Sequence, residues 1–332
     1  MPDCSLIPLR RAAAAALLAT AACMPGNGGG EEGSQYADTT NTPPGFGPAT
    51  EASGARRVGA IDGFLSPESV RYDPEQDVWF VSNILGYGSV KDGNGYIPKV
   101  SAGDLSHMET LAQGGKNGVV LDAPKGMALH GDTLWVADID QLRGFDRHNG
   151  APLATIDLRP QHAVLLNDVA IGPDGSIHVT DTGILMSDKG VIHVGGDKIF
   201  VIGPNRAISL QATGAALGWP NGITWDAKGK RWVVVTFDPF HSTVNALRDG
   251  DTTHTELAAG VGRFDGVEAL DDGRLLVTCW NDSSVHLFGS GADDRIVRHL
   301  SQPADLGLDT RRHRIAVPLG MLGRVEFWQL PA

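Results

Sequence analysis

The chain has 332 residues, of which 42% are hydrophobic and 20% are charged, and its formal net charge is -12 at pH 7. A negative net charge repels nucleic acids and anionic lipid surfaces, so we expect neither as a partner. The 43 glycines and 19 prolines, together with the lack of any long helical pattern, favour a single large all-β domain.

The N-terminal segment differs in composition from the rest of the chain. Arg10 and Arg11 precede the alanine-rich run 12–22, which is too short to span a bilayer but has the length of a signal-peptide core. The tetrapeptide TAAC, which ends at Cys23, is similar to a bacterial lipobox. We therefore predict a signal peptide over 1–22, with lipidation at Cys23.

The stretch 23–54 is rich in Gly, Glu, Ser, Thr and Pro, which predicts a flexible tether. The alternative is ordinary cleavage near residues 19–21, which would leave a soluble periplasmic protein. On either interpretation we expect an exported bacterial protein, periplasmic or membrane-anchored, that contacts the membrane only through an N-terminal lipid. Cys4 would leave with the signal peptide, and Cys279, in an apolar strand pattern, is expected to be a buried structural thiol.

One unit of sequence recurs six times after residue 55. Each copy has a short apolar run, a turn rich in Asp, Gly, Pro and Lys, and a second run of Val, Leu, Ile and Trp, which is typical of a β-hairpin. The copies begin at Ser66, Ala123, Leu166, Trp219, Phe264 and Gln302. Repeats at intervals of roughly 40 to 55 residues indicate propeller blades.

Two further strands can be predicted after each hairpin, except that the chain ends after the third strand of the last unit. An orphan strand at Arg56–Ile61 supplies the missing one. We therefore predict a six-bladed β-propeller over 55–332, with four-stranded antiparallel blades and an N-terminal strand that closes the last blade. Propellers of this kind often stand alone, so we expect a monomer.

One position in the repeat changes its residue from copy to copy in an informative way. It reads Glu68, Lys125, Asn167, Asn221, Asp265 and Ala304. Because the innermost strand of each blade lines the central channel, these six side chains, which we call the column, should converge on the axis.

Four column residues carry oxygen donors: Glu68, Asn167, Asn221 and Asp265. Carboxylate and amide oxygens are the ligands that calcium prefers, and another divalent cation of similar preference would also fit. Zinc would favour His or Cys, which the column lacks. Four protein ligands leave room for water or substrate. The alternative is that these side chains only satisfy backbone groups at the entry to each hairpin.

The residues around the column resemble a known family. The motifs are LLNDVAIGPDGSIHVTDTG from Leu165, WPNGITWDAKGK from Trp219, FDGVEALDDGRL from Phe264 and SPESVRYD from Ser66. They are similar to the regucalcin/gluconolactonase family (senescence marker protein type), whose relatives include diisopropylfluorophosphatase and paraoxonase. This resemblance implies a six-bladed calcium-dependent hydrolase.

The resemblance also implies roles for particular residues. It places calcium ligands at Glu68, Asn221 and Asp265, with Asn167 as a further ligand or a substrate contact. The chain departs from the family pattern at Leu165, where sugar lactonases have an arginine, and at Lys125, which brings a cation into the column. A lysine there could stabilise a developing oxyanion.

The loops between second and third strands should emerge on the column's face, where binding and catalytic groups tend to lie. Those at 83–95 and 181–197 are long and glycine-rich, so we expect them to act as lids. The candidate catalytic residues are Asp168, Lys125 and His241, with His193, Asp181 and Asp238 as other candidate bases. The candidate substrate-binding residues are Asn167, Asn83 and Asp181.

These features predict a calcium-dependent hydrolase of esters or lactones that acts on a small molecule. The alternative is a non-catalytic exported propeller that binds a ligand or a protein partner, because the fold alone does not choose between them. A third interpretation, a strictosidine-synthase-like protein, would lack the metal ligands.

Overall fold

The computed structural model describes residues 50–51, 54–289 and 295–331. The predicted signal peptide, Cys23 and nearly all of the predicted tether lie outside these residues. Within the described residues no α-helix occurs, and no helix is long and apolar enough to cross a membrane.

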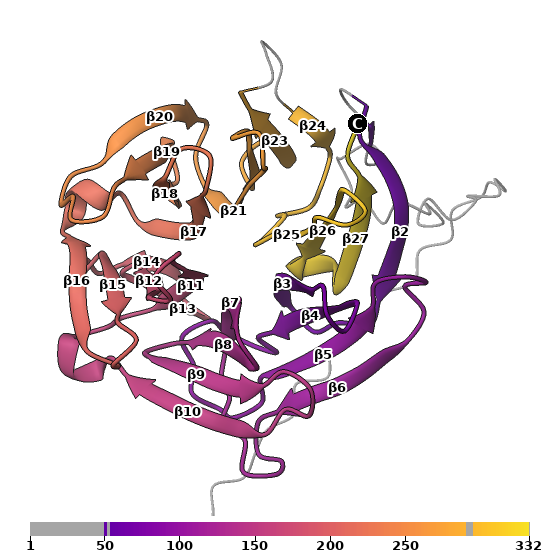
Figure 1. Cartoon of the computed structure of the whole chain (residues 1–332), viewed down its shortest axis with the longest axis horizontal. Coiled ribbons are helices and arrows are strands. Elements are labelled where there is room, and N and C mark those ends of the chain that lie inside the picture. Colours follow the sequence, from indigo (N-terminus) through magenta and orange to yellow (C-terminus); the bar gives the residue numbers. More distant parts are fainter. Residues whose placement is uncertain (1–49, 52–53, 290–294, 332) are drawn as a thin grey trace, which may run out of the picture. The chain divides into compact units, whose positions relative to one another are not determined.

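Six four-stranded antiparallel sheets surround a central axis, as Figure 1 shows. Blade 1 contains β3 (Pro67–Asp73), β4 (Val78–Asn83), β5 (Tyr96–Ser101) and β6 (Met108–Gln113). Blade 2 contains β7 (Pro124–His130), β8 (Thr133–Asp138), β9 (Gln141–Asp146) and β10 (Pro152–Asp157). Blade 3 contains β11 (Leu166–Ile171), β12 (Ile177–Asp181), β15 (Lys198–Ile202) and β16 (Ile208–Thr213).

The remaining blades follow the same order from the axis outwards. Blade 4 contains β17 (Pro220–Asp226), β18 (Arg231–Thr236), β19 (Ser242–Leu247) and β20 (Thr255–Gly260). Blade 5 contains β21 (Phe264–Ala269), β22 (Leu275–Cys279), β23 (Ser284–Phe288) and β24 (Arg295–Arg298), and β1 (Thr50–Glu51) pairs with its outer edge. Blade 6 contains β25 (Gly307–Asp309), β26 (Arg314–Leu319), β27 (Arg324–Gln329) and β2 (Arg56–Asp62). The predicted six-bladed all-β propeller is confirmed.

Blade 6 is built from two segments that lie far apart in the sequence. Its outermost strand β2 pairs antiparallel with β27, from Arg56 opposite Gln329 to Asp62 opposite Arg324. Arg324 also donates to the Asp62 carboxylate at 2.7 and 2.8 Å. The two ends of the propeller therefore belong to one sheet.

The hydrophobic core lies between neighbouring blades. The Trp79 ring of blade 1 lies 5.9 Å from the Phe327 ring of blade 6, and Trp232 of blade 4 packs with Ile199 of blade 3. Similar clusters fill the other interfaces, and Cys279 is buried in the one that joins blades 4 and 5, as predicted for a structural thiol. Because the blades pack apolar side chains on both of their faces, their second strands, such as β4, β8 and β18, are mostly apolar and almost wholly buried.

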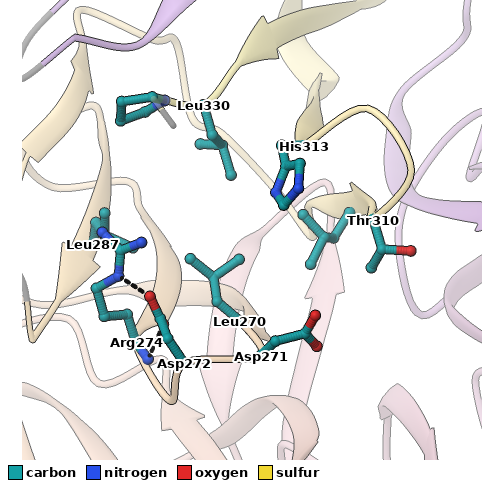
Figure 2. Close-up of a pocket in the computed structure, with 10 residues that line it drawn as sticks. Leu270, Asp271, Asp272, Arg274, Leu287, Thr310, His313 and Leu330 are labelled. Carbon is teal, nitrogen blue, oxygen red and sulfur yellow. Dashed lines mark hydrogen bonds and ion pairs between the residues drawn. The ribbon is translucent and has the colours of Figure 1, made fainter.

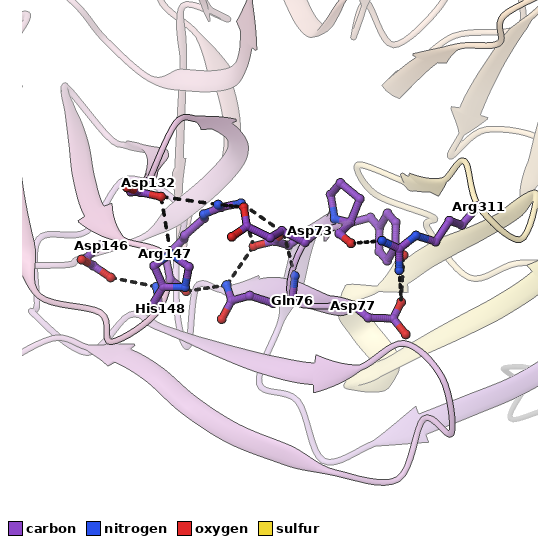
Figure 3. A network of polar contacts seen from close by, with 11 residues as sticks. Asp73, Gln76, Asp77, Asp132, Asp146, Arg147, His148 and Arg311 are labelled. Atoms are coloured by element: carbon purple, nitrogen blue, oxygen red, sulfur yellow. Dashed lines mark hydrogen bonds and ion pairs between the residues drawn. The ribbon is translucent and has the colours of Figure 1, made fainter.

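Ion pairs join blades on the face opposite the column. Arg147, which follows β9, donates to both oxygens of the buried Asp73 at 3.2 and 3.3 Å, and it also contacts Glu75 and Asp132 (Figure 3). Arg311 reaches across from blade 6 to the Asp77 carboxylate and the Pro74 carbonyl of blade 1 in the same view. These contacts close the ring at the blade 6, blade 1 and blade 2 junctions.

Three short 3₁₀ turns, η1 (Arg159–Gln161), η2 (Ala215–Leu217) and η3 (Gly320–Leu322), connect strands. The predicted loop 181–197 contains a small hairpin that sequence patterns did not reveal, β13 (Ile184–Ser187) and β14 (Gly190–His193). Gly190 has φ of +98°, a conformation that favours glycine at the turn of this hairpin.

Candidate functional site

The column residues stand at irregularities in the innermost strands. In blades 1 to 5 the register between the first and second strands shifts at the column, for example between Pro67 and Ser69 and between Phe264 and Val267. A bulge of this kind bends the strand and re-aims a side chain, and it is common beside active sites. Five of the six column residues lie at these shifts, and all six line one cavity of about 260 Å³.

Hydroxyl groups on the second strands satisfy the backbone at these shifts. The amides of Ser69, Asp168 and Gly266, each one residue after the column, donate to the hydroxyls of Ser82, Thr180 and Thr278 at 2.8 to 3.0 Å. Since a buried amide without an acceptor is costly, these hydroxyls stabilise the irregular backbone that presents the column.

Four buried oxygens in the column have no hydrogen-bond partner. They are Oε2 of Glu68, Oδ1 of Asn167, Oδ1 of Asn221 and Oδ1 of Asp265. Nearly all buried polar groups in proteins are hydrogen-bonded, so four unpartnered acceptors around one cavity need an explanation. Two carboxylates and two amide carbonyls form the hard-oxygen set that suits calcium, and the residues present therefore fit a divalent cation.

The two carboxylates also show the electrostatic cost of this arrangement. Burial, and then the nearby charge of Asp265, raise the pKa of Glu68 well above its usual range. Burial, and then the charge of Asp305, raise the pKa of Asp265 in the same way. A bound cation would offset this repulsion, because it supplies the opposite charge at the same place.

Lys125 lines the cavity, but its ammonium is held by backbone oxygens. Its Nζ donates to the carbonyl of Gly88 at 2.8 Å and to that of Ala123 at 2.9 Å, and the side chain is 1% exposed. Burial lowers the pKa of Lys125 to about 8, while the Glu68 charge opposes this shift. Lys125 therefore connects the column to the loop that contains Gly88.

Asp168, a predicted catalytic residue, lies behind the column and does not line the cavity. Its carboxylate accepts from the amides of Val169 at 2.7 Å and Ile223 at 2.8 Å, which links blade 3 to blade 4. Burial raises the pKa of Asp168 to about 7. These contacts give Asp168 a structural role between two inner strands.

Asp305 is a residue that sequence analysis missed. It is 1% exposed, its Oδ2 accepts from Ser69 Oγ at 2.5 Å, and its Oδ1 has no partner. A Cβ on Gly266 would lie 2.5 Å from Asp305 Oδ1, so the glycine leaves space for this carboxylate. The sequence feature that could have revealed it is the position of Asp305 directly after Ala304, which is the same repeat position as that of Asp168 after Asn167.

The two other predicted substrate-binding residues, Asn83 and Asp181, hold backbone instead. Asn83 Oδ1 accepts from the Leu65 amide at 3.0 Å. Asp181 accepts from the amides of Val164 and Leu165 at 2.9 and 2.8 Å, and burial raises its pKa. Both residues end the second strand of their blade and fix the segment that enters the column, and neither lines the cavity.

The candidate bases on the loops are also outside the cavity lining. His241 is exposed, and its backbone amide donates to Asp238 Oδ1 at 2.9 Å. His193 stacks on Trp219 with ring centroids 4.4 Å apart, and its Nε2 lies 2.6 Å from Asp197 Oδ1. Among the described residues that line the cavity, the carboxylates are those of Glu68 and Asp265.

The two long loops meet above the column. The Ser89 amide donates to the Met186 carbonyl at 3.2 Å, and the Met186 amide donates to Ser89 Oγ at 2.8 Å. A Cβ on Gly88 would lie 3.1 Å from Met186 Sδ, which shows how closely the loops approach. The predicted lid segments 83–95 and 181–197 therefore both contribute to the cavity lining, and hydrogen bonds join them to each other.

A second, smaller cavity of about 140 Å³ lies between blades 5 and 6 at the far ends of the inner strands (Figure 2). Leu270, Leu287 and Leu330 surround it, and Arg274 pairs with Asp272 at its edge at 2.7 Å. No unpartnered buried oxygen has been identified among its described lining residues, so it lacks the chemical character of the column cavity.

Comparison with known proteins agrees with this geometry. The sequence model of the SMP-30/gluconolactonase/LRE-like region matches residues 66–306, which contain the whole column. The chain belongs to the SMP-30/gluconolactonase/LRE-like family. Among curated protein sequences, no significant match is found.

Solved structures share the fold with this gluconolactonase-like chain at low identity. A gluconolactonase from Xanthomonas campestris is 17% identical, with a TM-score of 0.62 over 86% of this chain and 98% of its own. A luciferin-regenerating enzyme is 12% identical, with a TM-score of 0.62 over 83% and 95%. Virginiamycin B lyase from Staphylococcus aureus is 11% identical, with a TM-score of 0.54 over 84% and 99%.

Proposed function

We propose that this protein is a calcium-dependent hydrolase of lactones or esters. The observation that carries the proposal is the set of four buried, unpartnered oxygens on Glu68, Asn167, Asn221 and Asp265 around one cavity. Membership of a gluconolactonase-like family supports the reaction class.

The four column residues would hold the ion. When bound, calcium acts as a Lewis acid toward a carbonyl oxygen. The chain's own part in the reaction is to position the substrate and to move a proton. Since Glu68 and Asp265 carry the carboxylates of the described lining, a carboxylate oxygen of one of them that does not hold the ion would accept the proton of the attacking water.

Lys125 acts as a positioning residue in this proposal. Its ammonium holds the Gly88 carbonyl, and so it keeps the 83–95 loop above the column. The paired loops would limit the access of bulk water to the column, which strengthens electrostatic interactions inside the cavity.

The test is a panel of chromogenic esters and lactones, assayed with calcium, with chelator and after calcium is restored. We expect turnover that chelator abolishes and calcium restores. Asp265→Ala should lose both calcium binding, measured by calorimetry, and activity. Asp271→Ala, which removes an exposed acid from the same blade, should keep both. Activity of Asp265→Ala in metal-free buffer would refute the proposal.

A non-catalytic binding role is the second candidate. It is favoured by one observation, that His193, His241 and Asp238 do not line the cavity. Calcium binding without turnover of any ester or lactone would support this role over the hydrolase.

We also propose that the protein acts outside the cytoplasm as a lipoprotein. The support is the arginine pair at Arg10 and Arg11, the apolar run after it and the lipobox-like sequence at Cys23. Mass spectrometry of the mature N-terminus tests this, and an unmodified Cys23 within an uncleaved chain would exclude it.

A further inference from the structure

The cavity above the column is walled by apolar side chains. The two joined loops supply Ile84, Tyr87, Ile184 and Met186, and the loops of blades 4 and 5 supply Phe237 and Trp280. The Phe237 and Trp280 rings pack edge to face with centroids 5.0 Å apart, which gives this wall a fixed shape.

Polar side chains that could recognise hydroxyl groups are few. Apart from the column, the side chains of the described lining that carry polar atoms are those of Ser66, Tyr87, Ser187, Trp280 and Gln302, and Trp280 Nε1 is a buried donor without a partner. The Lys125 ammonium already donates to two carbonyls. A polyhydroxylated ligand would therefore bury more hydroxyl groups than the cavity can hydrogen-bond. Each hydroxyl group that loses its hydrogen bonds to water without gaining one to the protein weakens binding.

The mouth of the cavity is apolar as well. Tyr87 is 50% exposed, Val191 is 43% exposed and Met321, on η3, is 70% exposed, and all three line the cavity. Methionine adapts its shape to different apolar ligands, so Met186 and Met321 suit a flexible chain.

The charge of the site also selects its ligands. The described lining contains no arginine or histidine, and its one lysine is held by backbone oxygens. The chain carries a net charge of -12, which disfavours an anionic ligand. A neutral molecule is therefore favoured over one that already bears a carboxylate or phosphate.

We propose that the site takes neutral lactones or esters that carry an alkyl or aryl substituent, in preference to polyhydroxylated sugar lactones. This inference rests on the proposed function. In the reaction, a water oxygen bonds to the carbonyl carbon, the ring C–O bond breaks and the ring oxygen takes a proton. The product is a hydroxy acid that ionises to an anion.

The experiment compares γ-butyrolactone, γ-hexalactone, γ-octalactone, γ-decalactone and glucono-δ-lactone on the full chain in calcium. We expect kcat/KM to rise by about fourfold for each methylene that enters the cavity. Glucono-δ-lactone should be a poorer substrate than γ-octalactone. Met186→Gln, which has a similar shape but is polar, should reduce the ratio of γ-decalactone to γ-butyrolactone by about fivefold. Leu210→Gln, on the outer strand β16, is the matched control and should keep that ratio.

A binding measurement tests the preferred ligand class separately from the proposed hydrolase activity. A heptyl-substituted cyclopentanone, which cannot be hydrolysed, is titrated by calorimetry into the wild-type chain and into Met186→Gln. Binding that the variant weakens, without turnover of any lactone, would uphold the ligand class and refute the hydrolase. A flat chain-length series with glucono-δ-lactone as the best substrate would overturn the ligand class and leave the hydrolase standing. If the protein neither binds the cyclopentanone nor hydrolyses any lactone, the inference is overturned.

Discussion

The buried carboxylates of the column should make one substitution stabilising without calcium and destabilising with it. Asp265 is 3% exposed, its Oδ1 has no partner within the protein, and the charges of Asp305 and Glu68 lie nearby. A buried polar atom left unpaired costs about 1–3 kcal/mol, and more when it is charged. Asp265→Asn keeps the shape of the side chain and removes its charge.

In chelator, Asp265→Asn should therefore be more stable than the wild type by about 1–3 kcal/mol. For a domain of this size each kcal/mol shifts Tm by roughly 2–4 °C, so we expect an increase of about 2–12 °C. In calcium at about 100 times Kd the wild type gains about 2.7 kcal/mol from the ion, and the variant loses most of this gain. The order of the two melting temperatures should then be reversed.

The assay is differential scanning calorimetry of both proteins in chelator and in calcium. Asp271→Asn, an exposed acid on the same blade, is the control and should behave like the wild type in both buffers. A variant that melts below the wild type by the same amount with and without calcium would refute the reasoning, because the carboxylate would then stabilise the fold independently of the ion.

Three other predictions concern the lysine, an ion pair and the thiol. Lys125→Met should bind calcium more tightly, because a cation near Glu68 is lost, yet should lower kcat/KM by about tenfold as Gly88 loses its donor; weaker calcium binding in calorimetry would contradict this. Arg312, and then Tyr72, hold the pKa of Asp77 at about 2, so the stability from this carboxylate is present above its unfolded pKa and is lost as pH falls towards about 2. Asp77→Asn should lower the free energy of unfolding by about 1 kcal/mol at neutral pH, a value discounted for the partial exposure of Asp77. Urea titrations should show that the difference in unfolding free energy between variant and wild type shrinks below about pH 4. A difference that stays constant with pH would exclude the Asp77 carboxylate as its origin. Burial raises the pKa of Cys279 to about 12, so in a chain with Cys4→Ser and Cys23→Ser a thiol reagent at mildly alkaline pH should react only after unfolding.

The order of the strands and the register of the column follow from local sequence patterns. Each unit repeats an apolar run, a turn and a second apolar run, and this pattern determines which residue begins each inner strand. For that reason Glu68, Asn167, Asn221 and Asp265 could be grouped in advance, and the structure brings all four to one cavity.

The roles of the surrounding residues depended on contacts between distant segments. Asn83 and Asp181 are polar and stand at loop entrances, which sequence analysis interpreted as binding positions, but their hydrogen bonds go to backbone amides. The sequence could not show that Lys125 holds Gly88, since this contact spans 37 positions in the chain.

The contacts of Asp305 and of the two long loops also join segments that lie far apart in the sequence, so local patterns did not predict them. Asp305 bonds to Ser69 across 236 positions, because the ring closes where its two ends meet. Ser89 and Met186 join two loops that lie 97 positions apart. Repeat patterns encode the blade, which is a local structure, whereas the closure of the ring decides which loops meet above its axis. By itself the sequence determined the fold and the four oxygen-bearing side chains of the column, and only the tertiary structure decided the apolar cavity above them.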